Sequence, residues 1–152
     1  MRFWMLNNMR EKIQYEVILT SKGLSKTKFR IDLLRLFCNS KKSLLVDDII
    51  VFFGNMINKV TVYRALEDFE NKGLIHKVPD KKNRKRFSLC DFDECSQNSH
   101  IHNHSHFICD ICNTTFCIDD IIPPTISNIK GYHIKQSSLI LEGYCEECNS
   151  TN

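Results

Sequence analysis

Two pairs of cysteines, each separated by two residues, are the strongest chemical signal in this sequence. They are Cys109 with Cys112 and Cys145 with Cys148. This spacing lets both thiolates of a pair reach one metal ion from a tight turn, and four thiolates complete a tetrahedral zinc site with bonds of about 2.3 Å. The pattern therefore predicts a structural zinc site. A redox-active cysteine pair is the alternative, but it requires a βαβ unit that the sequence does not show.

Four histidines occupy every second position from His100 to His106, just before the first cysteine pair. On an extended segment their side chains would point to one side, and neutral imidazole binds zinc, iron and other first-row metals. His76 and Cys90 stand earlier in the chain. If they join these histidines, one ion would connect two parts of the chain and act as a switch. A mobile polar loop is the alternative.

Charge divides the chain into two parts. Residues 1–90 carry 19 Lys/Arg and 9 Asp/Glu, a net charge of +10, whereas residues 91–152 carry 2 and 9, a net charge of −7. The basic part suggests a polyanionic partner, with a solvated basic surface as the alternative. No run approaches the roughly 18 apolar residues of a membrane span, and the N-terminus lacks the pattern of a secretory signal. We therefore expect a soluble, cytoplasmic protein with no membrane partner.

Helices in the first part of the chain and strands in the second must position these groups. Apolar residues at helical spacing predict four helices, in the first twenty residues, at 27–39 with Thr27 as the N-cap, at 46–53, and from Asn58 to Gly73. Two short strands, at 74–78 and 86–90, flank a basic turn. After a polar hinge at 91–99, β-branched and aromatic residues predict strands, with one short helix at 123–129.

Helices followed by a basic hairpin predict a winged helix-turn-helix that binds DNA. In that fold the start of the reading helix contacts bases in the major groove while the hairpin contacts the backbone. The expected DNA contacts are Lys59, Thr61, Tyr63 and Arg64 on the fourth helix and Lys81, Lys82, Arg84, Lys85 and Arg86 on the hairpin. The alternative is an amphipathic core helix whose polar face is only solvated.

Several segments, taken in order, resemble the ferric uptake regulator (Fur) family. They are Thr61-Val62-Tyr63-Arg64-Ala65-Leu66, Gly73-Leu74-Ile75, the run from His104 to Cys112, and Gly143-Tyr144-Cys145 with Cys148. The resemblance runs from about Gly23 to Cys148. It implies a metal-dependent repressor that is not an enzyme and that acts as a homodimer on AT-rich palindromic DNA.

The fold that this resemblance implies is of the α+β class. A winged-helix DNA-binding domain would occupy residues 1–90, followed by the hinge at 91–99. A small α/β dimerisation domain, which binds metal and holds the structural four-cysteine zinc site, would occupy residues 100–152.

Within the family, the zinc uptake regulator (Zur) branch is the most similar. Ser43 stands where iron-sensing members have a histidine, and His76 and Cys90 match ligands of the zinc branch. The resemblance therefore implies a second, regulatory zinc ion and control of metal-uptake genes. The implied ligands are His76, Cys90, His104 and His106, with His102 and Cys117 as alternatives.

Two other functions stay open. An iron- or peroxide-sensing regulator of the same fold would bind iron or manganese through the histidines and Asp91 or Asp93. A thiol oxidoreductase or zinc hydrolase is the more remote alternative. The cysteines can close their own zinc site, and the sequence contains neither an HExxH motif nor a nucleophile elbow.

Overall fold

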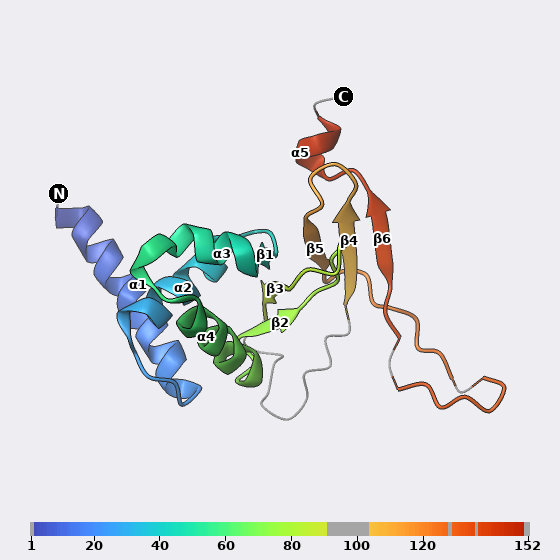
Figure 1. Cartoon of the computed structure of the whole chain (residues 1–152), viewed down its shortest axis with the longest axis horizontal. Helices are drawn as coiled ribbons and strands as arrows, with labels where there is room; N and C mark the ends of the chain where they lie inside the picture. Colours follow the sequence, from blue (N-terminus) through green and yellow to red (C-terminus); the bar gives the residue numbers. More distant parts are fainter. Residues whose placement is uncertain (1, 91–103, 128, 136, 151–152) are drawn as a thin grey trace.

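The structure is a computed structural model that describes residues 2–90, 104–127, 129–135 and 137–150. Helices form its N-terminal side, and two small sheets lie beside them (Figure 1). The helices are α1 (Arg2–Ser21), α2 (Lys28–Asn39), α3 (Val46–Phe53), a 3-10 turn η1 (Gly54–Met56), and α4 (Lys59–Asn71). Within the described residues, none of the helices is both long and apolar enough to cross a membrane.

The helix boundaries follow from local capping. The Thr27 hydroxyl accepts a hydrogen bond from the backbone N–H of Arg30 at the start of α2. The Asn58 side chain accepts one from Val60 at the start of α4, at 2.8 Å. These side chains satisfy N–H groups that have no partner within the helix. The expected N-caps Thr27 and Asn58 are therefore confirmed.

The four helices share one apolar core. Its most buried members include Leu19 of α1, Phe37 of α2, Ile49 of α3 and Phe69 of α4. Phe69 lies on the apolar stripe of α4, so the opposite face of that helix remains in solvent. The core thus fixes which face of α4 is presented outward.

The first sheet packs next to this helical core. Its strands are β1 (Leu44–Leu45), β2 (Ile75–Lys77) and β3 (Arg86–Leu89), in the order β1-β3-β2 and all antiparallel. The hairpin of β2 and β3 matches the expected strands. β1 was not predicted because two residues are too short to show a strand periodicity. Helices α2 to α4 and this sheet together form a winged helix.

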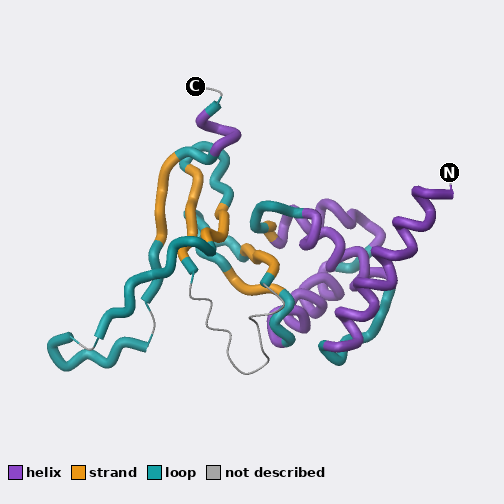
Figure 2. The backbone as a smooth tube through the Cα atoms, turned by 180° about the vertical axis from the view of Figure 1, so that it is seen from behind, coloured by secondary structure: helices purple, strands orange, loops and turns teal. Residues whose placement is uncertain are grey.

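The second sheet contains β4 (Ser105–Cys109), β5 (Thr115–Ile118) and β6 (Ile140–Gly143), in the order β5-β4-β6. β4 pairs antiparallel with β5 and parallel with β6, and α5 (Glu146–Asn149) follows β6. Seen from behind, the two sheets lie next to each other beside the helices (Figure 2). We call the helices with the first sheet the winged unit and the second sheet with α5 the metal unit.

One predicted element is wrong. The helix expected at 123–129 is absent from the described residues of that stretch, and Ile129 instead forms an isolated bridge with Tyr132. Pro124 biases the residue before it away from helical dihedral angles, and a proline supplies no N–H to a helix. The hinge expected at 91–99 lies outside the described residues.

Candidate metal centres and nucleic-acid interface

The four cysteines of the two pairs come together at one end of the metal unit. Their sulfur atoms all lie within 4.8 Å of one another. Cys109 ends β4 and Cys145 is the N-cap of α5. The parallel pairing of β4 with β6 places Gly143 beside Cys109, which brings the second pair next to the first.

The sulfur geometry fits a tetrahedral zinc ion. The Sγ atoms of Cys112 and Cys145 are 3.9 Å apart, and zinc–sulfur bonds of about 2.3 Å imply a sulfur–sulfur distance of about 3.8 Å. Four sulfur donors leave no position open for a substrate. The arrangement is that of a structural site.

Backbone donors and neighbouring sulfurs act on the thiols of this site. Burial opposes ionisation of Cys109, but backbone N–H groups of Cys145 and Cys112 donate to its sulfur and lower its pKa to about 6. The pKa of Cys148 is raised to about 12, first by its hydrogen bond with Cys145 and then by burial. A metal ion that binds here must displace the protons that remain on these thiols.

A second group of ligand atoms lies where the metal unit meets the winged unit. His76 of β2, His104, His106 of β4 and Cys117 of β5 offer ligand atoms that all lie within 4.8 Å of one another. His106 and Cys117 are directly paired across β4 and β5. His104 precedes β4 and shares a side with His106, and their ring centroids are 4.8 Å apart. Three imidazoles and one thiol fit a first-row divalent metal.

This group joins two elements that are distant in the sequence. His76 belongs to the winged unit, and its Nε2 lies 3.5 Å from the sulfur of Cys117. The rings of His76 and His104 meet edge to face, with centroids 5.1 Å apart. His76 and His106 are both buried, at 7% and 9% exposure. A metal ion held here would therefore have ligands from both units.

Cys90 lies behind His76 instead of within this group. Its sulfur is 3.5 Å from Nδ1 of His76, whereas Cys117 faces Nε2 of the same ring. The structure thus brings together three of the expected ligands with the alternative Cys117. It places Cys90 where a partner that orients a ligating histidine is found. His102 lies outside the described residues.

One hydroxyl group, of Ser88, and one carboxylate, of Asp119, lie beside the second ligand group. Burial raises the pKa of the Cys117 thiol; a hydrogen bond with Ser88 lowers it, and the charge of Asp119 raises it further. One oxygen of Asp119 also lies 3.8 Å from Nδ1 of His104. Cys117 therefore holds its proton at neutral pH, and a metal ion must displace that proton to bind the sulfur.

The outward face of α4 carries the residues expected to contact DNA. Lys59, Thr61, Tyr63 and Arg64 are all exposed. Lys85 of the hairpin places its Nζ 5.4 Å from the centroid of the Tyr63 ring, within the range of a cation–π interaction. Lys85 of the wing therefore lies beside the exposed face of α4.

The cations of the wing have different environments. Lys82 and Lys85 are exposed, Lys81 pairs with Asp110 of the metal unit at 2.5 Å, and Arg84 pairs with Asp80 at 3.1 Å. Arg86 was expected to contact DNA, but its side chain is only 4% exposed. Because its N–H groups are used inside the protein, this expectation is corrected.

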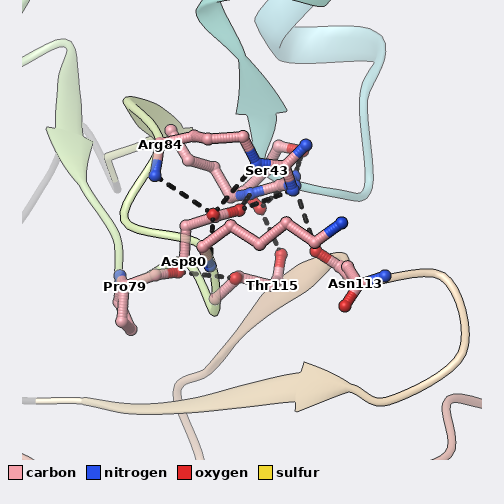
Figure 3. Close-up of polar contacts among 8 residues, drawn as sticks. Ser43, Pro79, Asp80, Arg84, Asn113 and Thr115 are labelled. Atoms are coloured by element: carbon pink, nitrogen blue, oxygen red, sulfur yellow. Dashed lines mark hydrogen bonds and ion pairs between the residues drawn. The ribbon is translucent and has the colours of Figure 1, made fainter.

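Sequence reasoning missed the buried polar cluster around Arg86. Asp80, Ser43 and Thr115 are all buried there, and the side chain of Asp80 has no exposed surface (Figure 3). The single acidic residue at the start of a run of five cations was the only available signal. Here β3 turns Arg86 inward, and Asp80 is the acid that pairs with it.

The fold and both ligand groups define a metal-binding winged-helix protein. The sequence pattern of the Ferric uptake regulator family matches residues 21–144, and the chain belongs to that family. It is therefore a metal-responsive, DNA-binding transcription regulator and not an enzyme.

Curated relatives match along most of their length. The ferric uptake regulation protein of Synechococcus elongatus is 27% identical over 139 residues, which cover 86% of this chain and 89% of the relative. That of Neisseria meningitidis serogroup B is 26% identical over 148 residues, covering 92% and 96%.

Solved structures confirm the fold. A zinc uptake regulator complexed with zinc and DNA superposes with a TM-score of 0.61 at 19% identity, covering 94% of this chain and 95% of that one. A ferric uptake regulator from Francisella tularensis with iron gives 0.54 at 24% identity, covering 84% and 96%. A zinc-bound manganese uptake regulator gives 0.58 at 20% identity, covering 86% and 98%. These three structures contain regulators of different metals on one fold.

Proposed function

We propose that this chain is a zinc-responsive repressor of metal-uptake genes. The observation that carries the proposal is the donor set of the second ligand group, in which the sulfur of Cys117 joins three imidazoles. Thiolate and imidazole together favour zinc over ferrous iron, whereas iron and manganese sites use more carboxylate oxygen. The four-cysteine site would hold a separate, structural zinc ion.

The position of this group supports a regulatory role. His76 comes from β2 of the winged unit, and the other three ligands come from or adjoin β4 and β5 of the metal unit. A zinc ion bound by all four would hold the two units in one orientation. Because α4 belongs to the winged unit, that orientation sets where its exposed face points.

The exposed face of α4 supports the DNA-binding half of the proposal. Tyr63 and Arg64 would contact bases and phosphates in the major groove, and Lys82 and Lys85 would contact the backbone. In a homodimer the two reading helices would be held at a spacing that matches a palindromic, AT-rich operator. The metal unit and the segment between β5 and β6 expose large apolar residues suited to a dimer interface, namely Ile121, Ile122, Ile126, Ile129, Tyr132, Ile140 and Tyr144.

DNA binding with defined metals tests the proposal. The probe is a duplex selected from a random library with zinc-loaded full-length protein. Fluorescence anisotropy is then measured anaerobically with zinc, ferrous iron or manganese at controlled free concentrations. We expect tight binding at the lowest free concentration with zinc. Equal or tighter binding at lower free ferrous iron would overturn the zinc assignment.

An iron or manganese sensor is the second candidate, and one contact favours it. The carboxylate of Asp119 lies 3.8 Å from Nδ1 of His104, so an oxygen donor stands beside the imidazoles. If Asp119 rather than Cys117 completed the site, the donor set would suit iron or manganese. The variant Asp119→Asn distinguishes the two: loss of metal-dependent DNA binding would favour this candidate, and unchanged zinc-dependent binding would favour the first.

A further inference from the structure

Arg86 connects three separate segments of the chain through its guanidinium group. Nε donates to Oδ1 of Asp80 at 3.0 Å, Nη1 donates to the carbonyl of Ser43 at 3.1 Å, and Nη2 donates to the carbonyl of Asn113 at 3.0 Å. Ser43 precedes β1 in the winged unit, whereas Asn113 follows Cys112 in the metal unit. One side chain therefore bridges the wing, the start of β1 and the loop of the four-cysteine site.

Other hydrogen bonds run alongside this bridge (Figure 3). The backbone N–H and the hydroxyl of Ser43 both donate to the carbonyl of Thr115, the N–H at 3.2 Å. The Thr115 hydroxyl donates to the carbonyl of Pro79 at 2.6 Å. Thr115 lies on β5, two positions before Cys117. The contacts thus form a polar seam between the two units, close to both ligand groups.

The carboxylate of Asp80 holds the bridging guanidinium in place. Its Oδ2 accepts from Nε of Arg84 at 3.1 Å and from the backbone N–H of Lys82 at 3.0 Å, while its Oδ1 accepts from Arg86. The side chains of Asp80 and Arg86 are 0% and 4% exposed. A buried ion pair with this many hydrogen bonds is rigid, because moving either partner leaves a buried charge uncompensated.

We propose that Arg86 is a positioning residue for DNA binding, which orients the wing on the metal unit without touching DNA. The proposal rests on the DNA-binding surface proposed above. Its basis is the reach of the guanidinium: its planar set of donors connects Asp80 to carbonyls on both units, and a single ammonium group cannot match that geometry. The wing then keeps one orientation relative to the four-cysteine loop, and Lys85 remains next to Tyr63.

The salt dependence of DNA binding separates positioning from phosphate contact. Each phosphate neutralised by a cation contributes about −0.9 to the slope of log affinity against log salt. Arg86→Lys keeps the charge but cannot reach all three partners. We expect about tenfold weaker binding of zinc-loaded protein to the selected duplex, with an unchanged salt slope. The matched control is Lys85→Gln, which should lower the slope by about 0.9.

The hydrogen-exchange rate of the Ser43 amide measures directly whether the polar seam is intact. This N–H donates across the units to Thr115, so its hydrogen exchange should accelerate in Arg86→Lys while amides within α4 keep their protection. Thr115→Val removes the hydroxyl bond to Pro79 with little change of shape. It supplies a second test if Arg86→Lys fails to fold, and it should also accelerate Ser43 exchange and weaken binding without a change in slope.

The outcomes distinguish the two proposals. Wild-type affinity and Ser43 exchange in folded, zinc-loaded Arg86→Lys would overturn the positioning role. For the neutral variant Arg86→Gln, a slope lowered by about 0.9 with unchanged Ser43 exchange would instead make Arg86 a phosphate contact. An unchanged slope of log affinity against log salt in Lys85→Gln would count against the proposed DNA-binding surface on α4 and the wing. The Ser43 exchange rate would then still decide whether Arg86 holds the seam.

Discussion

Replacing Cys117 by serine should remove high-affinity zinc binding at the second ligand group and leave the four-cysteine site loaded. The sulfur of Cys117 is the only thiol among the ligand atoms of that group, and it lies 3.5 Å from Nε2 of His76. Serine has nearly the same shape, but its hydroxyl does not ionise at neutral pH. The fold should therefore survive while one ligand is lost.

Comparison with Cys90→Ser sets the scale of the effect. Cys90 contacts Nδ1 of His76, the ring nitrogen that faces away from Cys117. Altering a partner that orients a ligating histidine lowers metal affinity by about 10- to 100-fold, which is about 1.4 to 2.7 kcal/mol. Loss of a ligand should exceed this range. We therefore expect a loss of more than about 100-fold for Cys117→Ser, and a loss within the range for Cys90→Ser.

Two measurements on reduced protein check this expectation. Competition with a chromophoric chelator gives the zinc affinity of each variant. Cobalt substitution reports thiolate ligation through the sulfur-to-cobalt charge-transfer band, and the second group should lose this band only in Cys117→Ser. Cys38→Ala is the matched control, because Cys38 lies on α2 outside both ligand groups.

The opposite pattern would refute the reasoning. If Cys90→Ser removed the cobalt band of the second group and Cys117→Ser retained it, Cys90 would be the thiolate ligand. The ligand set would then be the one implied by the resemblance to zinc uptake regulators, and the contact between Cys117 and His76 would have no role in binding.

Three further predictions concern the four-cysteine site, the effect of pH and the buried ion pair. Cys109→Ser should reduce bound zinc from two ions per chain to at most one and unfold the metal unit, as metal analysis and circular dichroism would show; retention of both ions would refute the site. The zinc affinity of the second ligand group should rise by up to about tenfold per pH unit from about pH 7 to 8.5. Burial raises the pKa of the Cys117 thiol, so zinc must displace its proton in this range. A zinc affinity independent of pH would contradict this. Asp80→Asn should lower the free energy of unfolding in urea by about 3 to 5 kcal/mol, because it leaves Arg86 buried without its counter-charge. The same variant should lose less stability in acid than the wild type. Burial opposes ionisation of Asp80, but the hydrogen bonds from Arg84 and Arg86 lower its pKa. The ionised carboxylate therefore contributes to the free energy of unfolding above about pH 4, and this contribution is lost below that pH. If Asp80→Asn lost as much stability below about pH 4 as the wild type, the stabilising role of the ionised Asp80 carboxylate would be refuted.

The helices of the winged unit could be predicted from the sequence because their signals are local. Thr27 and Asn58 cap α2 and α4 as expected, and α3 spans the predicted residues 46–53. A cap and a period of 3.6 residues are both read within a few turns. The helix expected at 123–129 failed because Pro124 disfavours helical dihedral angles in the residue before it, and Ile126 and Ile129 are exposed, so no buried apolar face offsets this cost.

The composition of the second ligand group could be predicted only in part. Histidine spacing indicated His104 and His106, but the choice between two cysteines depends on strand pairing. Cys117 enters the group because β5 places it opposite His106, and no local pattern specifies that register. The role of Arg86 was missed for a similar reason. Its three partners come from segments that meet only in the folded chain.

The strand β4 links the two ligand groups of the metal unit. It carries His106 of one ligand group and Cys109 of the other, and alternation along a strand turns these two side chains to opposite faces. The partner cysteines Cys145 and Cys148 follow β6, which pairs with β4 on the side opposite β5. The two pairings of one strand thus assemble both ligand groups, because β5 brings Cys117 to His106 and β6 brings the second cysteine pair to Cys109. A substitution that shifts β4 in its sheet should therefore disturb both ligand groups together.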